Sequence, residues 1–90
     1  MKDKVFIVKV TRFGFSRSSE HTHTGTLAEL KKTFSYTLEC GKSWEHERGN
    51  KKINTDPKSI SSLISNLNKA AENTGAHYPT AYYELIDTIQ

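Results

Sequence analysis

The chain has few of the residues that form disulfides, rigid turns or membrane-spanning segments: its 90 residues contain one cysteine, two prolines and no long apolar run. Because Cys40 has no second cysteine to pair with, an intrachain disulfide framework is excluded, and a reducing compartment such as the cytosol fits. No segment approaches the roughly 20 apolar residues of a membrane-spanning helix, and Met1–Lys4 leads into a β-like segment instead of a signal-peptide core. We therefore expect a cytoplasmic protein without a membrane segment.

Apolar residues are also scarce, at 34% of the chain, so one small domain over residues 1–90 must draw its core from a few clusters. The expected clusters are Val5/Ile7/Val10, Leu27/Leu30/Phe34/Leu38, the apolar face of a helix that starts near Ile60, and Leu85/Ile86/Ile89. A core this small is often supplemented by self-association, which predicts a homo-oligomer.

Charge is unevenly distributed along the chain. Twelve Lys/Arg face seven Asp/Glu up to Lys58, whereas the remainder has Lys69 against three acidic residues. A basic front and an acidic back can draw an anionic partner to one side or stack protomers head to tail. A solvated surface with an accidental dipole is the alternative explanation.

The strongest local signal runs from Asp56 to Gly75 and predicts a helix. Asp56 is a good N-cap, Pro57 suits the first helical position, and Gly75 can close the helix in a left-handed turn. Apolar residues recur at helical spacing on one face, which therefore needs a surface to pack against. These residues are Ile60, Leu63, Ile64, Leu67 and Ala71.

The remaining chain predicts three strands around a shorter helical segment. Lys4–Thr11 is β-branched and aromatic almost throughout, which is typical of a strand buried on much of both faces and central in a sheet. Arg12–Ser19 is expected to be a turn and Glu20–Thr24 a second strand. Pro79 breaks the chain before a final strand over Ala81–Ile89.

A capping box, Thr26 with Glu29, starts a helix expected to continue through Leu38 and to end at Gly41. Apolar and polar residues also alternate over Thr33–Cys40, which makes a strand the alternative there, although the capping box and the terminal glycine favour a helix. The predicted fold is α+β in β-β-α-α-β order, a small antiparallel sheet with two helices packed on one face. We find no internal repeat and no second domain.

The polar segment Lys42–Thr55 is expected to be an exposed loop or loose hairpin with a turn at Gly49-Asn50, and it carries the main candidate site. Lysine and arginine supply positive charge, Trp44 offers a face on which a base can stack, and amides can bond base edges. The predicted ligand-binding residues are Lys42, Trp44, His46, Arg48, Lys51 and Lys52, with Asn50, Asn54 and Lys58 nearby. Three acidic residues reduce the local charge to +2, and a solvated loop with Trp44 folded onto the core is the alternative.

Two weaker patterns bear on ligands. Arg12–Arg17 (RFGFSR) is similar to the aromatic and basic strand of an RNA-recognition fold, but it follows the first strand, where a turn with both aromatics packed on the helices is favoured. Arg12 and Arg17 could still add to a basic surface. His21 and His23 would face the same way on a strand, yet they lack the spacing of established zinc sites. We expect no metal and no cofactor.

Catalysis has little support in the sequence. Cys40 next to a histidine could act as a nucleophile, but no glycine-rich phosphate loop, nucleophile elbow or paired-carboxylate motif is present. The helix after Pro57 has an unusually neutral polar face, which would allow close approach by a partner. That face comprises Ser59, Ser61, Ser62, Ser65, Asn66 and Asn68. We therefore expect a binding protein and not an enzyme.

Two segments, Phe34–Gly41 (FSYTLECG) and Asp56–Ile60 (DPKSI), resemble small accessory proteins encoded by bacteriophages. The resemblance implies a viral protein in the host-cell cytoplasm that neutralises a host factor or a nucleotide signal without catalysis. The sequence hypothesis is thus a non-enzymatic phage-type accessory protein that sequesters an anionic ligand, a nucleotide or nucleic acid, or neutralises a host factor. The alternative is a protein-binding inhibitor that acts through the neutral helix face.

Overall fold

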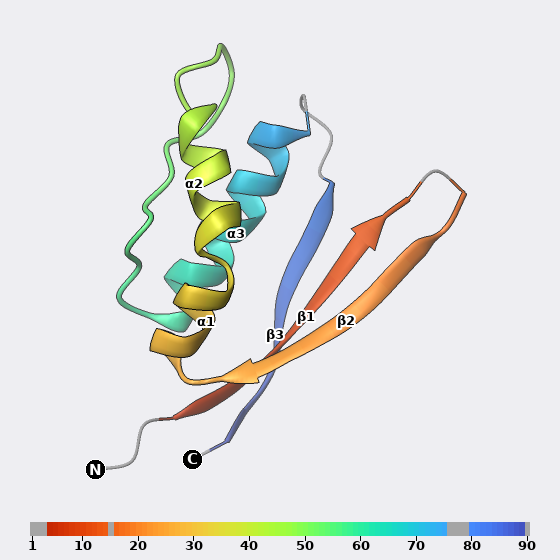
Figure 1. Cartoon of the computed structure of the whole chain (residues 1–90), viewed down its shortest axis with the longest axis vertical. Helices are drawn as coiled ribbons and strands as arrows, with labels where there is room; N and C mark the ends of the chain where they lie inside the picture. The colour runs from red at the N-terminus through yellow and green to blue at the C-terminus, as the bar shows by residue number, and fades with distance from the viewer. Residues whose placement is uncertain (1–3, 15, 76–79, 90) are drawn as a thin grey trace.

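Three strands and three helices make up the described part of the chain, residues 4–14, 16–75 and 80–89 of the computed structural model. In chain order they are β1 (Val5–Phe13), β2 (Ser18–Gly25), α1 (Leu27–Thr33), α2 (Ser35–Ser43), α3 (Ile60–Thr74) and β3 (Ala81–Ile89). The helices form one layer over one face of the sheet (Figure 1). The predicted α+β class and β-β-α-α-β order are confirmed, except that the first helical segment is divided into two helices.

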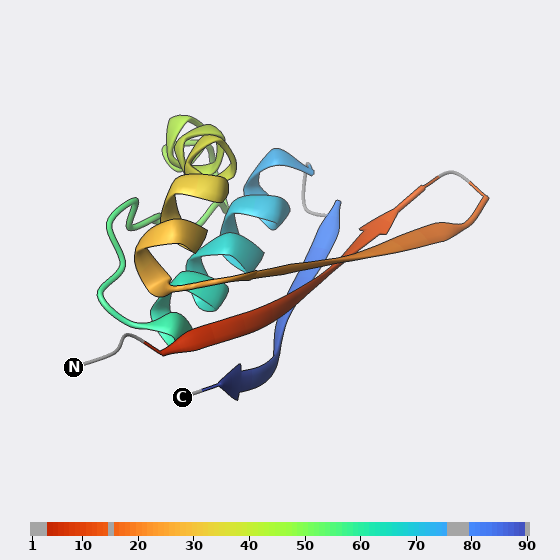
Figure 2. The same cartoon turned by 60° about the horizontal axis from the view of Figure 1, so that its bottom comes forward.

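β1 is the central strand of the antiparallel sheet, as predicted, because the strand order is β2-β1-β3. β1 continues through Phe13, and the hairpin closes where the Gly14 N–H donates to the Arg17 carbonyl over 3.0 Å. The predicted turn Arg12–Ser19 is therefore too long, since its first two and last two residues belong to strands. The far end of the β1–β2 hairpin projects beyond the helices (Figure 2).

Alternation along β1 gives the sheet two different faces. On the covered face, Phe6, Val8 and Val10 are buried beneath the helices. On the uncovered face, β1 contributes Val5, Ile7, Lys9, Thr11 and Phe13, of which none is fully buried. The prediction that this strand is buried on both faces is therefore wrong, because no other described element packs against the second face.

The core lies between the covered face and the helices. The predicted apolar face of α3 is confirmed: Leu63 and Leu67 are completely buried, and Ile60 and Ile64 pack at the margin. Phe34 lies edge-on to Tyr83 of β3, with ring centroids 5.6 Å apart.

The capping box at the start of α1 is present as predicted. Thr26 Oγ1 accepts the Glu29 N–H over 3.2 Å, and Glu29 Oε1 accepts the Thr26 N–H over 2.9 Å. The chain bends at Phe34, where φ is −101° and ψ is 11°, and this bend separates α1 from α2.

Residues 35–43 are helical, so the alternative strand over Thr33–Cys40 is wrong. α2 also passes Gly41, the predicted end of the helix. A Cβ atom at Gly41 would lie 2.6 Å from Cα of Ala70 on α3, closer than real Cβ contacts. This glycine therefore allows two helices to touch and does not terminate one.

The start of α3 differs from the prediction. Its N-cap is Ser59, whose hydroxyl accepts the Ser62 N–H over 3.1 Å, and not Asp56. Pro57 is buried ahead of the helix instead of occupying its first position. Gly75 caps the other end as expected, but with φ −95° and so without a left-handed turn.

The predicted C-terminal core cluster is wrong, since Leu85, Ile86 and Ile89 are 40%, 50% and 47% exposed. The helices cover the start of β3, where Ala81 and Tyr83 are buried, and the strand then runs past the end of the helical layer (Figure 1). Pro79 lies outside the described residues.

Candidate functional site

The segment between α2 and α3 holds the predicted site and is anchored to the helices by two buried amides. Asn73 donates to the carbonyls of Gly41 (3.0 Å) and Lys51 (2.8 Å), and it accepts the Lys51 N–H (2.9 Å). Asn66 accepts the Asn54 N–H over 2.8 Å. The segment is therefore held in place, although most of its side chains are exposed, as predicted. The predicted loop Lys42–Thr55 begins too early, since Lys42 and Ser43 belong to α2.

Ion pairs occupy some of the predicted cations. Lys51 Nζ lies 2.6 Å from Glu72, and Lys42 Nζ lies 3.5 Å from Glu45. A hydrogen bond from the Ile53 N–H, assisted by Lys42, lowers the pKa of Glu45 and keeps its carboxylate charged. Within the described ranges, Lys52 makes no ion pair.

Two of the six predicted residues meet in one pocket. Lys42 and Lys52 line a depression of about 550 Å³ together with Lys69 of α3, and we call it the three-lysine pocket. The other lining residues are Ile53, Asn54, Thr55, Ser62 and Asn66. These are neutral, so no carboxylate is among the described residues that line the pocket.

The other predicted residues lie elsewhere. Lys51 lines a separate hollow of about 160 Å³, and Trp44, His46 and Arg48 do not line the three-lysine pocket. Trp44 is the C-cap residue of α2 and is 51% exposed, so its ring is neither buried in the core nor beside the clustered lysines.

Sequence reasoning missed Lys69, although a signal for it exists. Ser62, Asn66 and Lys69 follow one another at spacings of four and three residues, which places them on one face of a helix. Tracing this face from Asn66 would have found the third lysine.

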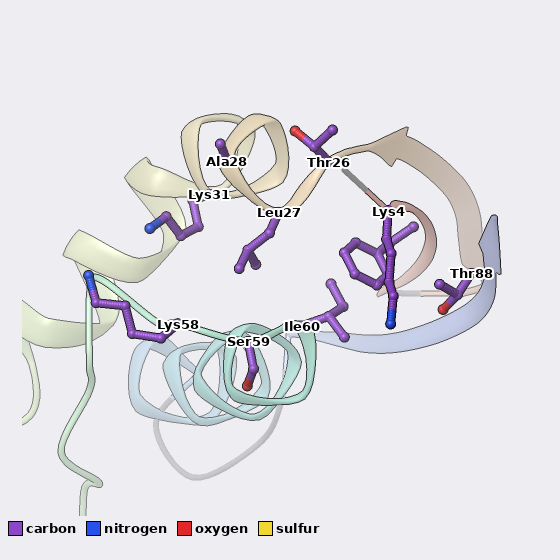
Figure 3. A pocket seen from close by; sticks show the side chains of 10 residues that line it. Lys4, Thr26, Leu27, Ala28, Lys31, Lys58, Ser59, Ile60 and Thr88 are labelled. Atoms are coloured by element: carbon purple, nitrogen blue, oxygen red, sulfur yellow. The ribbon is translucent and has the colours of Figure 1, made fainter. Parts of the chain in front are cut away.

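A second pocket, of about 660 Å³, lies between α1, the start of α3 and the ends of β1 and β3; we call it the α1–α3 pocket. Figure 3 shows Leu27, Ala28 and Ile60 around it, with Lys31 and Lys58 on one side and Lys4 on another. Phe6, Thr26, Ser59 and Thr88 complete the lining. Lys58, which the sequence groups with the loop, therefore belongs to a different site.

Asp56 joins two lysines of the α1–α3 pocket. Its carboxylate oxygens lie 2.6 Å from Lys31 Nζ and 2.7 Å from Lys58 Nζ. The hydrogen bonds from Lys31 and then Lys58 lower the pKa of Asp56 to about 2, so the carboxylate is charged at neutral pH. Two ammonium groups around one carboxylate leave one positive charge at this position.

In the described residues, the two weaker candidates from the sequence, the histidine pair and the Arg12–Arg17 segment, do not form a site with either pocket. His23 packs edge-on against Phe34 at 5.0 Å, and the described residues contain no cluster of three His, Cys, Asp or Glu that could hold a metal. Phe13 is 51% exposed and does not pack on the helices, so that part of the turn prediction is wrong. Phe15 lies outside the described residues.

Arg12 and Cys40 line one small pocket of about 310 Å³ with Tyr36 and Tyr83. Among the described residues that line this pocket there is no histidine and no carboxylate.

The neutral face of α3 is partly used inside the fold. Asn68 clamps the backbone of Tyr83, donating to its carbonyl over 2.9 Å and accepting its N–H over 2.8 Å. Asn66 is buried against the loop, whereas Ser61 and Ser65 are exposed. Only part of the predicted partner face is therefore available.

Comparison with family models, curated proteins and solved structures gave no match to this chain. No helix in the described residues is long and apolar enough to cross a membrane. The two pockets and the uncovered face of the sheet are the candidate binding surfaces of the described chain.

Proposed function

We propose that this is a non-catalytic protein that captures a phosphate-bearing anion, a nucleotide or nucleic acid, in the three-lysine pocket. The observation that carries the proposal is the convergence of Lys42, Lys52 and Lys69 on one pocket whose described lining residues include no carboxylate. Ammonium groups bind phosphate as point charges, and the hydroxyl and amide groups of the lining can add hydrogen bonds.

The wall of the three-lysine pocket is held in place by contacts within the fold, which favours binding. Its wall contains Ile53, which is buried, and Asn66, which bonds both the loop and the Ser62 carbonyl. Because these contacts already fix the loop, a ligand would lose less affinity to the ordering of the site. The volume is also within the range of about 300–1,000 Å³ that small-molecule sites occupy.

The accessory role belongs to the same proposal. A phage-type protein that removes a nucleotide signal from the host cytoplasm needs affinity for the ligand and no chemistry. Arg48 and Lys51 lie on the same loop outside the pocket, where a longer nucleic acid could contact them. Nucleotide and oligonucleotide binding therefore have to be compared directly.

The test is calorimetric titration of ATP and of a single-stranded oligonucleotide at about 50 and about 200 mM salt. We expect binding that weakens at the higher salt and is lost in Lys52→Glu/Lys69→Glu. Lys32→Glu is the matched control, because Lys32 is exposed on α1 and lines neither pocket. Undiminished affinity in the double variant, at an unchanged melting temperature, would exclude this pocket.

A second candidate function is binding of a protein partner, such as a host factor, through the uncovered sheet face. Three large apolar side chains on this face are about half exposed, Phe13 and Tyr82 at one end of the strands and Ile89 at the other, and exposed apolar surface of this kind is where a protein partner would be expected to bind. This candidate moves the predicted partner surface from α3 to the sheet. It predicts capture that resists high salt, survives Lys52→Glu/Lys69→Glu and fails in Phe13→Ser/Tyr82→Ser.

A further inference from the structure

The α1–α3 pocket exposes apolar surface inside a concave site. Leu27 and Ile60 pack against the core but are only partly buried, and both line the pocket with Phe6 and Ala28. Its volume of about 660 Å³ is in the range of ligand sites, which are typically apolar with a few polar groups. The apolar part can therefore accept the body of a small molecule.

Charge at the rim of this pocket selects for an anion. Lys4, Lys31 and Lys58 contribute ammonium groups, and none of the described lining residues is acidic. Asp56 holds Lys31 and Lys58 close together and leaves that pair with one net positive charge. In Figure 3 both lysines lie on the same side of Leu27, and their side-chain nitrogens form the edge of the pocket on that side.

Besides the three lysines, the polar lining residues are Thr26, Ser59 and Thr88, and two of their three hydroxyl groups are already engaged. The hydroxyl oxygens of Thr26 and Ser59 already accept the capping N–H groups of Glu29 and Ser62. A nucleobase buried here would leave hydrogen-bonding groups on its edges without partners, which is costly. An alkyl chain has no such groups and suits the site better.

We infer that the α1–α3 pocket is a second ligand site, for a small amphipathic anion: an alkyl chain that ends in one phosphate or carboxylate. The chain lies on Leu27, Ile60 and Phe6, and the head group meets Lys31 and Lys58. This site shares no lining residue with the three-lysine pocket, so either assignment can fail without the other.

The test follows backbone amide shifts of the whole chain by NMR during titration with decyl phosphate below its micelle-forming concentration. We expect the largest shifts at Leu27, Ala28, Ile60 and Thr88. Butyl phosphate carries the same head group on a shorter chain, and burial of the extra methylenes should make decyl phosphate at least about tenfold tighter. Decanoate, run in parallel, assigns the head group to carboxylate or phosphate by whichever binds more tightly.

Two variants test separately what the charge and the apolar surface contribute to binding. Lys31→Gln/Lys58→Gln should weaken decyl phosphate by about tenfold or more, whereas Lys32→Gln, a neighbouring lysine outside the pocket, should not change it. Ala28→Phe, at an exposed lining position, should block the chain and leave the melting temperature unchanged. Equal affinities for decyl and butyl phosphate, shifts centred on Lys52 and Lys69, or unchanged binding in both variants would each overturn the inference.

Discussion

The two faces of the sheet present the same three strands to different surroundings. On the covered face Val8, Val10 and Tyr83 are at most 2% exposed, and the helices exclude water from them. On the uncovered face Lys9 lies between Glu84 at 2.9 Å and Glu20 at 3.7 Å, with half-exposed apolar residues at either end of the strands. One face is thus specified by packing, whereas the other combines an ion-paired lysine with exposed apolar side chains.

The contrast between the two faces shows how far the burial of a strand can be predicted from a run of apolar residues. Val5–Val10 contains five apolar residues in six and would suit a strand buried on both sides. Its second face is only half-buried, because no other described element covers it.

Leu67→Ala should have the largest effect on stability. Leu67 is completely buried, so we expect a loss of about 2–5 kcal/mol, a large part of a total of about 5–15 kcal/mol. The same measurement by urea denaturation on Ile89→Ala, on the uncovered face, should give a change within about 0.5 kcal/mol. Similar losses at both positions would show that the uncovered face is buried in solution.

Gly41→Ala should cost about 1–3 kcal/mol, because the added Cβ would press on the backbone of Ala70 where α2 and α3 touch. Ala is the better helix former, so helix propensity alone predicts the opposite sign. Ser65→Ala, at an exposed position of α3, is the control and should be close to neutral. A stabilised Gly41→Ala protein would mean that the two helices can separate easily.

Self-association should depend on the uncovered face and not on the helical layer. If the predicted homo-oligomer forms, Tyr82→Lys/Ile89→Lys should shift it toward monomer in light scattering, since a lysine pair would be desolvated in a face-to-face contact. Its melting temperature should change little at a concentration where the protein is monomeric. A monomeric wild-type protein at high micromolar concentration would contradict self-association.

The pH dependence contributed by Asp56 should be the smallest effect, since this carboxylate is fully exposed. Its pKa is lowered from 3.8 to about 2, so its stabilisation is present above 3.8 and is lost as the pH falls through about 2. The melting temperature of the wild type should exceed that of Asp56→Asn at about pH 5, and the difference should vanish near pH 2. A constant difference across this range would assign the effect of the substitution to something other than charge.

Much of the fold follows from local patterns. The capping box of Thr26 and Glu29, the apolar spacing in α3 and the β-branched first strand each identify their element without tertiary information. The choice between Asp56 and Ser59 as N-cap could not be predicted in the same way. Lys31, which lies 25 positions away in sequence, donates a hydrogen bond to the Asp56 carboxylate. A tertiary contact therefore engages the side chain that local sequence alone would assign as the N-cap.

The pockets were less accessible to prediction. Lys42 and Lys52 are close in sequence and were identified, whereas Lys69 depends on how α3 packs beside the loop. The α1–α3 pocket combines residues from Lys4 to Thr88, and no local spacing brings them together. Trp44 was selected for its chemistry, but chemistry alone does not tell which way a chain turns after a helix.

The irregular pairing of β3 has a consequence for solubility. Between Ile7 and Val8 the register against β3 shifts, which bends this edge strand and makes it a poor template for adding another strand. The opposite edge, β2, contains no large apolar residue and carries charge at Glu20. Growth of the sheet into fibrils by edge-to-edge pairing is thereby discouraged on both sides, which leaves stacking through a face as the safer route to assembly.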